Sequence, residues 1–413
     1  MNAATRLMMT VAALLLLGLT TTRAAEPPVQ ELTLEEALRR AHEHHPRLAA
    51  ARAREEAAHG RTRQAGLWSN PALIAGAEQL RTDTDQPDSR ESILGFSQTI
   101  PLGGRVGKAR EAARLDQEAQ ARQVESVRRA VEREVRDAFA TALFQQRARE
   151  ILAQGAEDLE TGVSMARTRV QQGELAPHEI ANVEMDWSRF KLDLERSGEL
   201  ARFAMTSLAT AMGEPDRVPA SLAGELEAHF ELPSLEDVAN SLALHPDVLW
   251  DEAQARGADA RLKLARAERI PDVNVEVLFR RLEATDDRRL DMGLNVPLPL
   301  FNRNQGRVME ARAEVDAVRQ RQRWSGQERR LRLKEAHQQL QEALARVRAQ
   351  VDVIQPQAER ILQAAQARHA VGELSLVEVL AARGERTQAQ LEHLEALRMV
   401  MESWARLSEF VSI

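Results

Sequence analysis

The feature that most constrains the fold is an internal repeat with a period of about 200 residues. Four landmarks occur twice, in the same order and at nearly the same spacing, which chance does not explain. The pairs are 32–38 with 233–239, His45-Pro46 with His245-Pro246, 100–106 with 296–308, and 173–175 with 372–374. The chain is therefore expected to hold two copies of one plan, at 32–213 and 234–412, joined by a linker at 214–233.

The hydrophobic period changes in the same order within each copy. A helical segment comes first, at 32–68 and 234–268, and two strand-like segments follow as a β-hairpin, at 71–101 and 272–299. A very long helical pattern comes next, at 104–172 and 305–371, and a shorter helix closes each copy, at 177–212 and 375–411. The order helix, hairpin, long helix, short helix is thus predicted twice.

The long helical patterns have the narrow apolar seam that is typical of coiled coils. Apolar residues step by four and three along Val124, Val127, Val131, Val135, Ala138 and Ala142, along Val308, Ala311, Val315 and Val318, and along Val347, Val351, Ile354, Ala358, Ile361 and Ala365. About 70 helical residues reach about 100 Å, far more than a compact globule needs. Pro356 is expected to kink the second long helix.

The strand-like segments alternate apolar and polar residues, which gives one apolar face and one largely polar face. The clearest examples run from Val273 to Arg280 and from Arg289 to Leu298; the first copy has fainter ones at 72–80 and 93–100. Their length of about ten residues is what a tilted strand of a membrane barrel needs. Four strands cannot close a pore alone, so several chains are expected to share one sheet.

The N-terminus predicts export. An uncharged apolar run at 7–19 follows Arg6, and Thr22-Arg23-Ala24 is a small-x-Ala cleavage site, so residues 1–24 are expected to be a cleavable signal peptide; an uncleaved anchor is the alternative. The chain has no Cys, which excludes disulfides and lipidation at a Cys after the signal. Charged residues make up 29% of the chain and aromatic ones 3%, a balance that suits long solvated helices.

No catalytic or cofactor-binding constellation is present, so no enzyme activity and no cofactor are predicted. His42, His44 and His45 could bind a metal ion, but a solvated helix end with three incidental histidines is the favoured interpretation. Basic residues alternate with acidic ones along the helices, a pattern typical of a solvated coiled-coil face and not of a nucleic-acid site.

This arrangement resembles the TolC family of outer-membrane efflux proteins over nearly all of the chain after residue 24. The resemblance implies an α-dominated trimeric channel, in which three chains form a periplasmic helical barrel and share a 12-stranded transmembrane β-barrel. It also implies a periplasmic adaptor and an inner-membrane pump of the RND type as partners. The phrases 100–105 and 299–306 are most similar to the heavy-metal branch, the cobalt–zinc–cadmium type, which implies export of divalent cations.

The resemblance also implies site residues. Gly173, Leu175, Gly372 and Leu374 are expected at the periplasmic tips that meet the adaptor, although they could be simple turns. Glu378 matches the family acid that lines the narrowest point of the closed tube, where a ring of carboxylates would favour cations. This chain has Glu there in place of Asp, and Ala381 replaces a second family acid, so the ring could be weaker or lie elsewhere.

Other functions stay open at this point. The channel could export organic drugs instead of metals, since acidic rings occur in such channels too. A periplasmic adaptor would have one helical hairpin flanked by β-rich modules, and a structural coiled-coil protein would leave the alternating strands unexplained.

Overall fold

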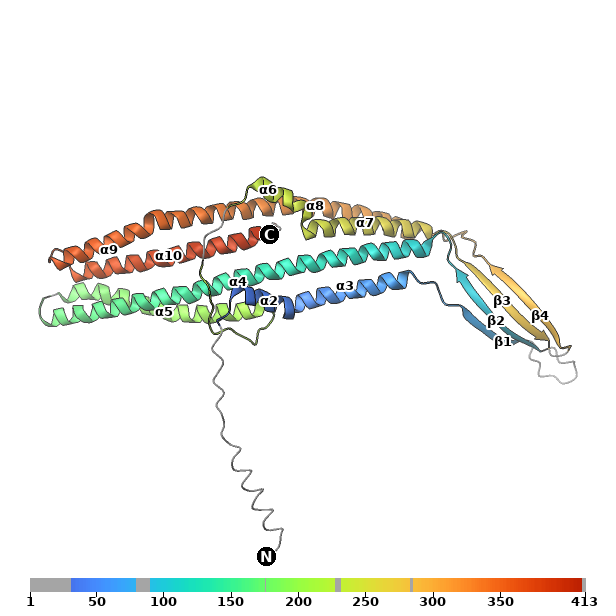
Figure 1. The fold of residues 1–413 in the computed structure, drawn as a ribbon, viewed down its shortest axis with the longest axis horizontal. Helices are drawn as coiled ribbons and strands as arrows, with labels where there is room; N and C mark the ends of the chain where they lie inside the picture. The colour runs from blue at the N-terminus through green and yellow to red at the C-terminus, as the bar shows by residue number, and fades with distance from the viewer. Residues whose placement is uncertain (1–30, 79–89, 175, 227–231, 283–284, 411–413) are drawn as a thin grey trace, which may run out of the picture.

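In the computed structural model, the described residues are 31–78, 90–174, 176–226, 232–282 and 285–410. They form a long helical rod with a four-stranded sheet at one end (Figure 1). The signal peptide predicted at 1–24, the tip residue Leu175 and most of the loop between the first two strands lie outside these residues.

The elements of the first repeat are α2 (Leu34–His44), α3 (Pro46–Ala65), β1 (Ala72–Glu78), β2 (Glu91–Ile100), α4 (Arg105–Gln171) and α5 (Pro177–Ala211). Those of the second repeat are α6 (Leu235–Ser241), η1 (Leu242–Leu244), α7 (Pro246–Ala267), β3 (Val273–Leu282), β4 (Asp287–Asn295), α8 (Gln305–Ala349), η2 (Gln350–Ile354), α9 (Gln355–Ala370) and α10 (Leu376–Ser408). The predicted two-repeat, mostly helical architecture is therefore confirmed.

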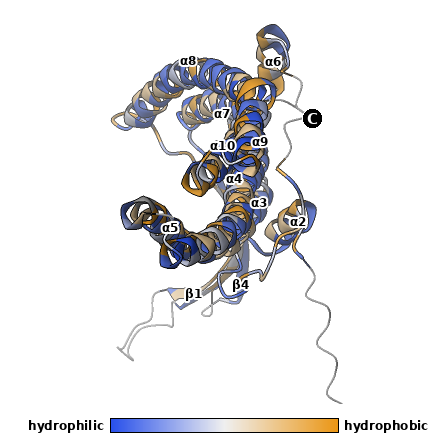
Figure 2. Ribbon diagram, turned by 90° about the vertical axis from the view of Figure 1, so that its left-hand side faces the viewer, coloured by the Kyte–Doolittle hydropathy of each residue, from blue (hydrophilic) through white to orange (hydrophobic). Residues whose placement is uncertain are grey.

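The helices form one curved layer. Seen from the end, α5, α4, α10, α7 and α8 follow an arc, while α2 and α6 lie outside it (Figure 2). Each of these two short helices packs on the long helix of its own repeat. Around α2, the core holds Val131, Val135 and Leu143 of α4; around α6, it holds Leu333, Leu340 and Ala343 of α8. Small alanines and valines let the helices pack closely along narrow seams, as the heptad spacing predicts.

The seam predicted on the second long helix is only partly correct. Val347, Ala358 and Ala365 are buried, but Val351, Ile354 and Ile361 are 51%, 38% and 56% exposed. The reason is a five-residue π turn, η2, where the Gln355 N–H bonds to the Gln350 carbonyl. Pro356, which lacks an N–H, follows directly. The helix is therefore interrupted just before Pro356, where a kink was expected. The π turn changes which side chains after it face the core of the chain.

The four strands form one antiparallel sheet in the order β1-β2-β3-β4. The register aligns large apolar side chains from all four strands on what we call the apolar sheet face: Leu73, Leu94, Phe96, Val277, Phe279, Leu290, Met292 and Leu294. All eight are at least 36% exposed. The other side, the polar sheet face, carries Glu78, Glu91, Glu276, Arg280, Arg289 and Asp291. The two edge strands, β1 and β4, each have a neighbour on one side only.

Candidate functional site

The two helical tips at the end opposite the sheet have the same backbone geometry (Figure 1). Gly173 and Gly372 have φ of +77° and +80°, a conformation that favours glycine. At the first tip, the Gly173 N–H bonds to the Val170 carbonyl and the Glu174 N–H to the Arg169 carbonyl, at 3.1 and 2.9 Å. The second tip repeats these bonds one for one from Gly372 and Glu373, at 3.0 and 2.9 Å. Both long helical runs therefore end in a Schellman motif, which places the two turns alike.

Leu374, a predicted docking residue, is not a free surface side chain. It is half-buried against Leu362, Ala365, Val379 and Ala382, between α9 and α10. The most exposed apolar residue of this tip is its neighbour Val371, at 72%. Of these two side chains, Val371 is the one that the tip exposes to solvent.

Glu378 lies three residues into α10 and is exposed. Its carboxylate accepts hydrogen bonds from the Ser375 N–H and hydroxyl, at 3.0 and 2.9 Å, while the Glu378 N–H donates to the Ser375 hydroxyl at 3.3 Å. This capping box fixes the carboxylate at the start of the helix. The bonds from Ser375 hold the pKa of Glu378 below its usual range, so it is ionised at neutral pH.

The two repeats meet near the tips through a close helix contact that the sequence analysis missed. Gly162 of α4 lies against Leu380 of α10 so closely that an added Cβ would overlap that side chain. One heptad away, Gly155 lies against Thr387, where an added Cβ would be 3.0 Å from the nearest side-chain atom. A neighbouring cavity of about 370 Å³ is lined by Phe190 of α5 and by the acids Asp186 and Glu385, among others. The seven-residue spacing of the two glycines is the signal that could have indicated this contact.

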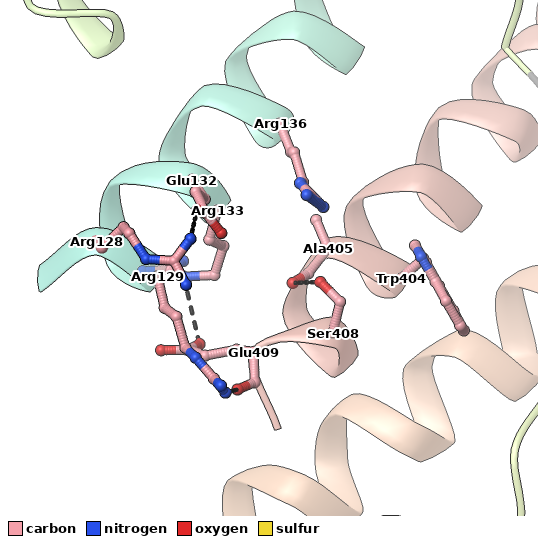
Figure 3. A pocket seen from close by; sticks show the side chains of 9 residues that line it. All are labelled: Arg128, Arg129, Glu132, Arg133, Arg136, Trp404, Ala405, Ser408 and Glu409. Carbon is pink, nitrogen blue, oxygen red and sulfur yellow. Dashed lines mark hydrogen bonds and ion pairs between the residues drawn. The ribbon is translucent and has the colours of Figure 1, made fainter. Parts of the chain in front are cut away.

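A second cavity, of about 550 Å³, lies midway along the rod between α4 and α10 (Figure 3). Its lining includes the α4 arginines Arg128, Arg129, Arg133 and Arg136, together with Trp404 of α10 and Glu409, the residue that directly follows α10. Arg133 is 3.4 Å from the Glu409 carboxylate, and the Arg129 guanidinium donates to the Glu409 carbonyl at 3.3 Å. Part of the predicted solvated charge pattern is therefore an internal contact between the repeats.

Burial raises the pKa of two acids in this region. It raises the pKa of Asp137 to about 6, against the opposing effect of Arg133, and it raises the pKa of Glu409. Both acids lie in the helical part of the rod, far from the sheet. Neither pKa shift is predictable from local sequence, because which face of α4 meets α10 depends on the packing of the whole bundle.

The three histidines at 42–45 do not converge. The His42 Nε2 is 2.8 Å from Glu132, His44 lies 3.8 Å from Glu43 and from Glu214, and the His45 Nδ1 accepts the Arg47 N–H at 3.1 Å. Across the described residues, no group of three or more His, Asp or Glu side chains is placed to hold a metal ion. The expected solvated helix end is seen only in part, because His44 is exposed whereas His45 is buried.

Within the same described residues, no helix is both long enough and apolar enough to cross a membrane. The long helices α4 and α8 instead carry many charged side chains.

Comparison with known proteins identifies the family. The family model described as "Outer membrane efflux protein" matches residues 37–214 and 238–411, one match for each repeat. The chain is 26% identical over 367 residues to the cobalt-zinc-cadmium resistance protein CzcC of Cupriavidus metallidurans, covering 89% of this chain and 86% of that protein. It is 28% identical over 319 residues to the nickel-cobalt-cadmium resistance protein NccC of Alcaligenes xylosoxydans xylosoxydans, covering 74% of this chain and 70% of that protein.

Among solved structures, the outer membrane protein VceC of Vibrio cholerae superposes with a TM-score of 0.75 at 21% identity. The match covers 91% of this chain and 95% of that one, so the fold is shared over nearly the whole length. The repeated helix-and-hairpin plan, the long rod and both halves of the family match lead to one conclusion: this chain belongs to the outer membrane efflux protein family, whose members are non-enzymatic outer-membrane channels of tripartite efflux systems.

Proposed function

We propose that three copies of this chain form a channel that exports divalent heavy-metal cations across the outer membrane. The similarity to CzcC and NccC, whose names describe resistance to cobalt, zinc, cadmium and nickel, is the observation that carries the substrate class. The proposal includes a periplasmic adaptor and an inner-membrane pump as partners. It also includes export by a signal peptide at 1–24 that is removed.

The exposed apolar surface supports assembly from several copies. At one end of the helical arc, α5 exposes Leu192 and Phe203, at 65% and 72% (Figure 2). On the other repeat, the long helical run of α8, η2 and α9 exposes Trp324, Val351 and Ile361, at 67%, 51% and 56%. A head-to-tail ring brings these two unlike surfaces together and closes on itself.

The sheet supports the same assembly. Its apolar face is exposed throughout, and β1 and β4 leave their outer backbone groups without a strand neighbour in one chain. Backbone groups in lipid must find partners, so β4 of one copy is expected to pair with β1 of the next. Three chains with four strands each then form the 12-stranded barrel that the family resemblance implies.

Acidic side chains support cation export. Glu378 is ionised and exposed close to the second tip, and threefold symmetry would bring three copies of it around the axis. A ring of carboxylates attracts cations and repels anions, yet single exposed carboxylates bind metal weakly enough to release it. The tips at Gly173 and Gly372, with Leu175 and Leu374, are the surfaces proposed to meet the adaptor.

The substrate class is tested by deleting the gene from its native host and measuring growth in zinc, cobalt, cadmium, nickel, copper and organic toxins. We expect sensitivity to one or more of the first four metals, with raised cellular metal content, and rescue by the wild-type gene. Sensitivity to organic toxins alone would instead assign the channel to drug efflux.

A further inference from the structure

One guanidinium on the polar sheet face joins all four strands. Arg280 of β3 places Nη1 3.0 Å from the Glu78 carboxylate of β1 and 3.1 Å from the Glu91 carboxylate of β2. Its Nε lies 2.9 Å from the Asp291 carboxylate of β4.

The strand register explains why a cation is needed there. Glu78 and Glu91 are directly opposite each other in the β1–β2 pair. Like charges in opposed positions repel and destabilise a sheet. Arg280 lies between them and offsets that repulsion, and Asp291 takes the remaining side of its guanidinium.

The position of Arg280 and its three acids on the sheet bears on the pore as well as on the stability of the sheet. The eight apolar residues that define the apolar sheet face point away from Arg280, and in a membrane channel that face contacts lipid. The polar sheet face then lines the pore. Glu78 ends β1, Glu91 begins β2 and Arg280 is two residues from the end of β3. These strand ends are the ones far from the helices (Figure 1), so the group lies near the outer mouth, at the opposite end from Glu378.

We propose that Arg280 sets the charge selectivity of the outer mouth by neutralising carboxylates that would otherwise face the pore. The inference rests on the proposed trimeric channel and goes beyond it, because it assigns a second selectivity element. Three carboxylates and one guanidinium leave two net negative charges in this group per chain, and Glu276 and Arg289 of the same face add one charge of each sign. The mouth therefore favours cations, and Arg280 limits how strongly it holds them.

The test is the reversal potential of reconstituted trimers under a KCl gradient in planar bilayers. Arg280→Gln removes one positive charge per chain, and two unit charges about 10 Å apart in water interact strongly enough to change ion distribution about twofold. We expect the cation-to-anion permeability ratio to rise by at least about that factor at low salt, and the rise to shrink at high salt as charges are screened.

Two variants separate selectivity from a structural role. Arg281→Gln is the matched control, because Arg281 is the next residue, lies on the opposite face and pairs with Asp286 at 2.8 Å; it should leave the ratio unchanged. Arg280→Gln/Glu91→Gln restores the original net charge and relieves the carboxylate repulsion, so it should fold even where Arg280→Gln assembles poorly. Its permeability ratio should return toward that of the wild type.

The outcomes are distinct. A wild-type ratio in both the single and the double Arg280 variants, with a shift in Glu378→Gln, would show a working pore in which Arg280 has no selectivity role. A wild-type protein that forms no ion-conducting pore at all would instead overturn the proposed channel itself.

Discussion

His45 and His245 hold the same position in the two repeats and make the same bond. In each, Nδ1 accepts the backbone N–H two residues on, from Arg47 and Asp247, at 3.1 Å. Each ends one helix and caps the next, directly before Pro46 or Pro246. Because Nδ1 accepts, the neutral ring carries its proton on Nε2, which in His245 donates to the Glu409 carbonyl at 3.0 Å.

These caps predict a pH dependence. Burial lowers the pKa of His45 and of His245 below the ordinary value of 6.5. A histidine that stays neutral in the folded chain but protonates when unfolded contributes stability above pH 6.5, and this is lost as the pH falls below that value toward the lowered pKa. We expect the thermal unfolding midpoint of the wild type to fall between pH 7.5 and pH 5.

Replacing each His by Asn tests whether protonation of these histidines causes the fall, because Asn caps helices but does not titrate. His45→Asn should weaken the acid-induced fall in the unfolding midpoint. His245→Asn should weaken it too, and it should also cost about 1 kcal/mol of stability at pH 7.5 because the Nε2 hydrogen bond is lost. His59→Asn, at an exposed site on α3, is the control. An equal fall in the wild type and in both cap variants would contradict the assignment.

A second prediction concerns a buried ion pair between α7 and α8. Asp251 and Arg329 form an ion pair with side chains only 5% and 12% exposed, and the Ser325 hydroxyl donates to Asp251 at 2.7 Å. Removing one member of such a pair leaves a buried charge uncompensated, so Asp251→Ala should cost about 3–5 kcal/mol of stability.

Asp259, farther along the same helix pair, provides the control. It pairs with Arg319 at 3.1 Å, but the two side chains are 41% and 54% exposed. Asp259→Ala should therefore cost about 1 kcal/mol or less. Thermal unfolding followed by circular dichroism compares the two, and similar losses in both variants would count against a buried role for Asp251.

The third prediction concerns Glu378 as a constriction residue. Glu378→Gln keeps a side chain that can bond to Ser375 but removes the charge, so the helix cap should survive while the cation-to-anion permeability ratio falls. Glu378→Lys should lower the ratio further and also weaken the cap. Glu373→Gln is the matched control, because Glu373 is another exposed acid of the same tip and pairs with Arg368 at 3.5 Å. If planar-bilayer recordings give the same ratio for Glu378→Lys and the wild type, Glu378 does not line the narrowest point.

The fourth prediction concerns adaptor docking at the tips. Val371→Glu places a charge on an exposed apolar site and should abolish metal resistance while trimers persist, because an unpaired charge would be buried in the complex. Charged replacements at Leu175 and Leu374 should also abolish efflux, but Leu374→Glu additionally disturbs its packing against Leu362. Val218→Glu makes the same change far from the tips, where the side chain is 47% exposed. Normal resistance with Val371→Glu would argue against docking at this turn.

Local periodicity predicted the helices and strands but not which of them pack against each other. Alternation located the strands, and glycines located the tips, because both signals depend on neighbouring residues. The contact of Gly162 with Leu380 joins residues more than 200 apart in the sequence, and nothing local specifies it. In the same way, Arg133 follows the charge pattern of exposed helix arginines, yet it packs toward Glu409. The π turn before Pro356 shows how one extra residue in a helical turn moves part of a predicted seam, Val351, Ile354 and Ile361, out of the core.

Every function proposed for this chain depends on a closed assembly of three copies in the outer membrane. Native mass spectrometry of the protein, extracted from purified outer membranes with mild detergent, tests it most directly. We expect a single species of three times the mass of one processed chain, which disappears when β1–β4 pairing between copies is blocked by proline in β4. A monomer that stays monodisperse in buffer without detergent would contradict it.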